Sequence, residues 1–150
     1  MAWSSFLFQI VRLVITVNGS ALFQPTDRTK FKRMLRAEVL LWRLNRTSLW
    51  KIPKRNWLIR RLFGSIDGDA YAIQVPFHAC YGDNIHAGRN FFANYNVTIM
   101  DHAEVRIGDD VMLAPNVQIL TATHPMLAEE REWCGASTTA LLRKVVVTGS

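Results

Sequence analysis

The spacing of apolar residues between positions 81 and 125 constrains the fold more than any other feature of this chain. One series at intervals of six consists of Ala87, Ala93, Ile99, Val105, Val111 and Val117, and a second of Ile107, Leu113 and Ile119. An interval of six fits neither the period of a helix nor plain alternation along a strand. It is typical of a parallel β-helix, in which each short strand forms one side of a coil.

Small and polar residues occur where the corners of such a coil are expected. These residues are Gly88, Asn94, Gly108, Asp109 and Asn116. Three sides of six residues make a coil of about eighteen residues, so this part of the chain supplies about two and a half coils. We therefore expect residues 81–120 to form stacked parallel strands with Val105, Val111 and Val117 inside.

Two helices are predicted before the repeat. Residues 28–44 follow a plausible N-cap at Thr26 and Asp27, and residues 56–63 precede Gly64, a candidate C-cap. The apolar stripe of the first helix consists of Phe31, Met34, Leu35, Val39 and Trp42, and that of the second of Trp57, Leu58, Leu62 and Phe63. We expect both stripes to face a core.

The charge of the chain is divided between its two halves. Residues 1–64 contain 13 of the 18 Lys and Arg side chains and have a net charge of +11, whereas residues 65–150 have a net charge of −5. A basic segment of this kind binds nucleic acid, an anionic membrane or a phosphorylated cofactor, or simply forms a solvated helical face. Because the aromatic residues lie at helical spacing, we expect the solvated face and no nucleic-acid partner.

Cysteine usage and the apolar start of the chain bear on its compartment. Cys80 and Cys134 fit no disulfide framework and no metal-binding spacing, which predicts free thiols, no bound metal and a cytoplasmic location. Residues 6–22 are apolar, but Arg12, Asn18 and Gly19 interrupt them. We therefore expect no membrane partner.

Several motifs, in order along the chain, carry a family resemblance. They are RAEVLLWRLNRT, LFGSIDGDAYAIQVPF, PFHACYGDNIHAGRNFFANYNVTIMD, VRIGDDVMLAPNVQILTATHP and EER. Together they resemble the maltose and galactoside O-acetyltransferases of the hexapeptide-repeat superfamily, over roughly residues 19–131. The resemblance implies a mainly β fold, a left-handed parallel β-helix preceded by a small helical domain. It also implies a homotrimer with an active site between neighbouring subunits, acetyl-CoA as co-substrate and a small sugar as acceptor.

The resemblance also assigns roles to four residues. His124 matches the general base, Asn94 the asparagine beside the acceptor hydroxyl, and Asp101 the acidic position of the acceptor site. Asp27 lies near the acidic residue that the helical domain contributes to the sugar site. His102 stands where the family often has a second acidic or a small residue.

Chemistry supports these residue types independently. A sugar hydroxyl is a poor nucleophile at neutral pH, and a neutral imidazole takes its proton as it attacks a thioester. An asparagine offers a hydroxyl both a donor and an acceptor. Without the resemblance, a turn residue is the simpler interpretation of His124 in Thr-His-Pro. We place the other histidines, His78, His86 and His102, on the coil surface or at corners.

The C-terminal part departs from the family, which continues with further coils that bind CoA. Here the chain reads MLAEEREWCGASTTALLRKVVVTGS, in which only Val145 and Val147 suggest another coil. The residues that bind the cofactor therefore stay unknown, and little activity is expected of the chain as written. The predicted division is an apolar extension (1–18), a helical domain (19–66), the coils (67–125) and a divergent tail (126–150). The main hypothesis is an acetyl-CoA-dependent O-acetyltransferase, and the alternative is a non-catalytic relic or interaction module.

Overall fold

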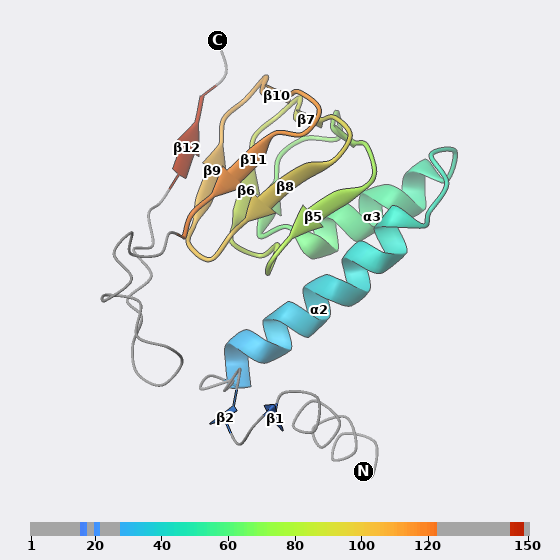
Figure 1. The fold of residues 1–150 in the computed structure, drawn as a ribbon. Helices are drawn as coiled ribbons and strands as arrows, with labels where there is room; N and C mark the ends of the chain where they lie inside the picture. The colour runs from blue at the N-terminus through green and yellow to red at the C-terminus, as the bar shows by residue number, and fades with distance from the viewer. Residues whose placement is uncertain (1–15, 18–19, 22–27, 123–144, 149–150) are drawn as a thin grey trace.

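The computed structural model of the chain describes residues 16–17, 20–21, 28–122 and 145–148. In these residues, the chain winds into successive coils of three short strands. The strands of neighbouring coils pair to form three parallel sheets, and two helices cover one end of the stack (Figure 1). The first sheet consists of β3 (Ser65–Ile66), β6 (Ile85–Ala87), β9 (Val105–Ile107) and β12 (Val145–Val147). The second consists of β4 (Ala72–Ile73), β7 (Phe92–Ala93) and β10 (Met112–Leu113), and the third of β5 (Phe77–Ala79), β8 (Val97–Met100) and β11 (Gln118–Leu120). Separately, β1 (Thr16–Val17) pairs antiparallel with β2 (Ser20–Ala21).

From β4 to β11 each coil takes twenty residues, not the predicted eighteen, whereas the step from β3 to β6 takes twenty-one. Phe77 pairs with Val97, and Ile85 with Val105, so partners on successive coils are 20 positions apart. The difference lies at the corner between the third and first sheets, where the inner positions advance by eight instead of six. Val105 consequently stacks on Ile85, and the predicted series from Ala87 to Val117 is interrupted between Ile99 and Val105.

The inner positions form the predicted core despite the longer coil. Ile99 and Val105 are fully buried, and Val111 is 4% exposed. Val117 is half-buried and packs against the core. The second series, Ile107, Leu113 and Ile119, is buried as well. The prediction of stacked parallel strands over residues 81–120 is therefore confirmed.

Four corner residues adopt the left-handed backbone conformation that asparagine and aspartate tolerate best. Asn90, Asn96, Asp110 and Asn116 have φ values between 56° and 63°. Their side chains also stack along the coil axis, because Asn90 Nδ2 donates to Asp110 Oδ1 (2.6 Å) and Asn96 Nδ2 to Asn116 Oδ1 (2.8 Å). Gly88 is required for a different reason, since a Cβ atom there would lie 2.4 Å from Asp109 Oδ1.

The C-terminal strand β12 extends the first sheet by one coil. Val145 pairs with Val105 and Val147 with Ile107, and the N–H of Gly108 donates to the Val147 carbonyl (2.8 Å). Val145 and Val147, which the sequence left open as the start of another coil, thus form a strand of that coil in this sheet. In the described residues, the second and third sheets end at β10 and β11.

Helix α2 (Arg28–Asn45) agrees with its prediction, and α3 (Ile52–Leu62) begins four residues earlier than predicted. Pro53 occupies the first turn of α3, where its missing N–H has no intrahelical partner to lose. Gly64 does not form a left-handed C-cap, because Phe63 ends the helix with extended backbone (φ −75°, ψ 153°). Instead, Gly64 permits close approach to Asp83, whose carbonyl oxygen a Cβ would meet at 2.4 Å.

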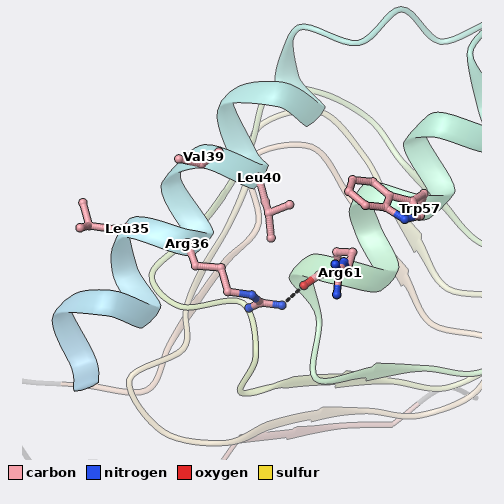
Figure 2. Close-up of a pocket in the computed structure, with 6 residues that line it drawn as sticks. All are labelled: Leu35, Arg36, Val39, Leu40, Trp57 and Arg61. Carbon is pink, nitrogen blue, oxygen red and sulfur yellow. Dashed lines mark hydrogen bonds between the residues drawn. The ribbon is translucent and has the colours of Figure 1, made fainter. Parts of the chain in front are cut away.

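The predicted apolar stripe of α2 is wrong. The face that the helix buries consists of Ala37, Leu40, Leu41 and Leu44. Four of the five residues of the predicted stripe are instead 38–55% exposed, namely Met34, Leu35, Val39 and Trp42. Apolar residues recur at helical spacing on both faces, so the pattern does not identify the face that packs. Figure 2 shows Leu40 directed towards α3.

The stripe of α3 is correct in three of its four residues. Leu58, Leu62 and Phe63 are buried, together with Ile59. Trp57 is exposed and lines a groove between the two helices with Arg36 and other residues of α2 (Figure 2).

Two polar side chains attach the helices to the end of the coil stack. The side-chain amide of Asn45, at the end of α2, bonds both backbone groups of Phe77, as a paired strand would. Its Oδ1 accepts the N–H of Phe77 and its Nδ2 donates to the Phe77 carbonyl, both at 3.0 Å. The buried Arg55 guanidinium donates to the carbonyls of Thr47 (2.8 Å), Ile73 (2.5 Å) and Leu44 (3.4 Å). These bonds connect both helices to the first coil.

We predict that Arg55→Met lowers the free energy of unfolding by on the order of 3 kcal/mol, because three buried carbonyls lose their donor. Chemical denaturation of the full chain measures this loss. Arg43→Met, at an exposed position of the same helical layer, is the matched control and should change stability by less than about 0.5 kcal/mol. Equal stabilities of the two variants would contradict the role assigned to Arg55.

Candidate active site

The corner between β8 and β9 is built around a buried carboxylate. Asp101 is fully buried, and its Oδ1 accepts the N–H groups of Cys80 and Tyr81, each at 2.9 Å. Its Oδ2 accepts the N–H of Asn84 at 3.3 Å. Burial raises the pKa of Asp101, while the hydrogen bonds from the backbone lower it by less. Asp101 therefore satisfies the backbone of the corner one coil below.

The same arrangement recurs one coil above with a hydroxyl in place of the carboxylate. Thr121, twenty residues after Asp101, is 2% exposed. Its Oγ1 donates to the Met100 carbonyl (2.7 Å) and accepts the N–H of Ala103 (2.9 Å). The corner between the third and first sheets, called the wide corner below, is thus held by two buried polar side chains, Asp101 and Thr121, that are twenty residues apart.

Helix α2 reaches this corner through Arg33. Its guanidinium pairs with Asp83, with Nη2–Oδ1 and Nε–Oδ2 distances of 2.5 Å and 2.9 Å, and donates to Asn84 Oδ1 at 2.8 Å. It also lies 4.7 Å from the centroid of the Tyr81 ring. The hydrogen bond that Arg33 donates to Asp83 raises the pKa of Arg33, so the guanidinium stays charged.

Cys80 and His102 lie side by side on the outside of the corner. Cys80 Sγ is 3.7 Å from His102 Nε2 and 3.7 Å from Met100 Sδ. Burial, with a smaller contribution from Asp101, raises the pKa of the Cys80 thiol to about 11. The thiol is therefore protonated at neutral pH and is a poor nucleophile.

Asn94 occupies a different corner, directly after β7. Its backbone N–H donates to the Leu113 carbonyl (3.0 Å), and its Oδ1 accepts the N–H of Tyr95 (2.8 Å). These bonds fix the side chain of this half-buried residue. Among the described residues, the Nδ2 group has no hydrogen-bond partner.

The four residues assigned by the resemblance are only partly placed. Asn94 and Asp101 lie at the two ends of β8, so one side of the coil separates them. His124 and Asp27 lie outside the described residues. The assignment of all four stays a prediction.

The structure places the remaining histidines and the described cysteine. His78 is exposed on β5, and His86 is half-buried on β6 with Nδ1 3.0 Å from Ser65 Oγ. Both lie on the coil surface and His102 at a corner, as predicted. Cys80 is a free thiol, whereas Cys134 lies outside the described residues.

Sequence reasoning missed the cluster of Cys80, Tyr81 and His102 around Asp101. The signal that would have found it is the twenty-residue coil, which aligns Tyr81 with Asp101 and Thr121. In an eighteen-residue coil, Tyr81, Asp101 and Thr121 would not lie above one another on successive coils.

The described residues contain neither a metal-binding cluster nor a membrane-spanning helix. No group of three or more His, Cys, Asp or Glu side chains there is arranged to hold a metal ion. No helix in the same ranges is both long and apolar enough to cross a membrane.

Known proteins with similar sequences and structures share this architecture. The chain is 39% identical over 116 residues to the galactoside O-acetyltransferase of Escherichia coli K12, a match that covers 77% of the chain and 57% of the relative. A maltose O-acetyltransferase structure from Clostridium difficile 630 is 39% identical, with a TM-score of 0.65, over 71% of the chain and 57% of that protein. A hexapeptide-repeat acetyltransferase of Vibrio cholerae, solved with acetyl coenzyme A, is 28% identical, with a TM-score of 0.73, over 84% of the chain and 65% of that protein.

These similarities establish the family and the fold. The chain belongs to the galactoside and maltose O-acetyltransferase family of hexapeptide-repeat proteins. Its fold is the expected left-handed parallel β-helix with a helical part before it. No family model matches the chain. The chain spans 57% of the length of the E. coli relative, so the matched part is little more than half of that protein.

We predict that Asp101→Ala destabilises the chain by on the order of 3 kcal/mol, because three backbone N–H groups lose their acceptor. Asp101→Asn should lie between this variant and the wild type, since the amide keeps one oxygen but directs N–H groups at the donors. Met112→Ala, at a position that is 75% exposed on β10, is the control and should lie within about 0.5 kcal/mol of the wild type. Wild-type thermal melting of Asp101→Ala would show that the carboxylate does not hold the corner.

Proposed function

We propose that this chain carries the acceptor side of an O-acetyltransferase that transfers the acetyl group of acetyl-CoA to a hydroxyl of a sugar or similar small molecule. The observation that supports this proposal most is the identity of 39% to a galactoside O-acetyltransferase over residues that form the same coils and corners. The Vibrio cholerae structure with acetyl coenzyme A supports the choice of donor.

In the proposed reaction, His124 is the general base. Its neutral imidazole takes the proton of the acceptor hydroxyl while the oxygen attacks the thioester carbonyl. The C–S bond then breaks, CoA leaves as a thiol after protonation, and the acetyl ester remains on the acceptor. No covalent enzyme intermediate is required, in keeping with the raised pKa of the Cys80 thiol.

Asn94 is proposed to orient the acceptor. Its Oδ1 is engaged by the N–H of Tyr95, which directs Nδ2 outwards as a donor to the hydroxyl oxygen. Asp101 and Asp27 complete the proposed acceptor site. Asp101, which is buried and bonded to the backbone, also holds the Cys80–Asn84 corner.

The assembly and location belong to the same proposal. A trimer would place residues of two subunits at each site, and light scattering of the purified chain measures its mass. A cytoplasmic location is supported by the free thiol of Cys80, since reducing compartments preserve thiols. The alternative, a non-catalytic relic or interaction module, predicts no thiol release in any context.

We predict that His124→Ala lowers kcat by on the order of 10²–10⁴-fold. The test joins residues 1–125 to the remaining coils of the E. coli relative and measures CoA release with galactoside, maltose and glucose. The rate should fall below about pH 6.5 as the imidazole becomes protonated. His78→Ala, on the exposed surface of β5, is the matched histidine control and should keep the parental rate. Equal rates for the two variants would make His124 a turn residue, and an inactive but folded chimera would favour the relic.

We predict that Asn94→Ala raises the KM for the acceptor by on the order of tenfold, the equivalent of one hydrogen bond, and leaves the KM for acetyl-CoA unchanged. Asn116→Ala, at the corner one coil above, serves as the comparison, since it removes a stacking amide without the proposed contact. A rise in both KM values for Asn94→Ala would indicate a general loss of structure and contradict an acceptor role.

A further inference from the structure

The loop between α2 and α3 exposes large apolar side chains at its tip. Trp50 is 92% exposed, Ile52 60% and Leu49 49%. They are close neighbours in sequence, and the loop projects beyond the coil stack (Figure 1). Exposed apolar side chains that are grouped in this way mark a contact surface, whereas single ones are ordinary.

The apolar tip is surrounded by positive charge. Residues 42–54 contain four basic side chains, Arg43, Arg46, Lys51 and Lys54, and no acidic one. The helical layer as a whole, residues 28–62, has twelve Lys and Arg side chains against the single acid Glu38. The tip therefore lies in a field that attracts anions.

Two further features concentrate positive charge beside the tip. Lys51 and Lys54 lie at the start of α3, where the helix dipole adds partial positive charge and no side chain caps the helix. The Arg46 guanidinium lies 4.7 Å from the centroid of the exposed Trp42 ring. Tryptophan together with lysine or arginine is the combination that membrane interfaces favour.

We propose that the tip of the α2–α3 loop docks on an anionic phospholipid surface. In this contact, Leu49, Trp50 and Ile52 enter the interfacial region of the bilayer, and Arg46, Lys51 and Lys54 meet the lipid phosphates. The contact is peripheral and differs from insertion of residues 6–22. It does not depend on the proposed acetyltransferase activity.

A lipid surface accounts for the tip better than a nucleic acid does. Single-stranded nucleic acid would use Trp50 for stacking and the basic residues for phosphates, but it offers nothing apolar to Leu49 and Ile52. A bilayer interface accepts aromatic and aliphatic side chains together. The structure therefore favours the bilayer, and an oligonucleotide serves as the competing ligand in the test.

The test is co-sedimentation of the full chain with phosphatidylcholine vesicles, with and without about 30% phosphatidylserine. We expect binding only to the anionic vesicles, with release at about 0.5 M salt. The tryptophan emission should shift to shorter wavelength on binding, and Trp50→Phe should lose most of this shift.

Two pairs of double variants separate the loop from general effects. Trp50→Ser/Ile52→Ser is compared with Met112→Ser/Leu120→Ser, which removes exposed apolar residues from the coil stack. Lys51→Glu/Lys54→Glu is compared with Arg28→Glu/Lys32→Glu, which changes the net charge equally at the opposite end of α2, about 27 Å away for 18 residues. All of these positions are exposed, so circular dichroism should show wild-type folding.

Both loop variants should weaken vesicle binding at least about tenfold, and both controls should remain within about threefold of the wild type. Absence of binding, equal binding to uncharged vesicles, or equal loss in a loop variant and its control would each overturn the proposal. Tighter binding of a single-stranded oligonucleotide that depends on Trp50 would replace the lipid with a nucleic acid.

Discussion

The constraint on which the rest of the structure depends is that each coil satisfies its backbone hydrogen bonds with the coils next to it. Strands of two to four residues are too short to be stable alone, and they persist because they pair in register with the next coil, at twenty-residue intervals from β4 to β11. The coil length therefore decides which side chains meet. It brings Asn96 and Asn116 together at one of the six-residue corners. At the wide corner it brings Tyr81, Asp101 and Thr121 together.

The ends of such a stack need other partners for their backbone groups. At the first coil, the helices supply them through Asn45 and the buried Arg55. These contacts explain why α2 turns the Ala37 and Leu44 face to the core. The other apolar residues of α2 remain exposed, and together with the α2–α3 loop they form a surface that does not pack against the coil stack.

The two candidate site residues that the structure describes lie at corners, because the inner positions are occupied by the core. Asn94 extends from one corner with its amide oriented by a backbone N–H, and Asp101 holds another from inside. The resemblance groups these residues as one acceptor site, and that assignment stays a proposal. In the structure, the Asp101 carboxylate also maintains the shape of its corner.

The six-residue periodicity by itself determined the β-helix and the identity of its inner residues. The family motifs added the candidate residues His124, Asn94, Asp101 and Asp27. Periodicity reports which residues are apolar and how they are spaced, and this information is local. The two extra residues of the wide corner, the packed face of α2 and the burial of Asp101 were decided only by the tertiary structure. Each of them depends on a partner that is distant in sequence, such as Ile85 beneath Val105 or the Cys80 and Tyr81 N–H groups beside Asp101. A helix with apolar residues on two faces buries the one that its neighbours complement, and the sequence of the helix does not contain that information.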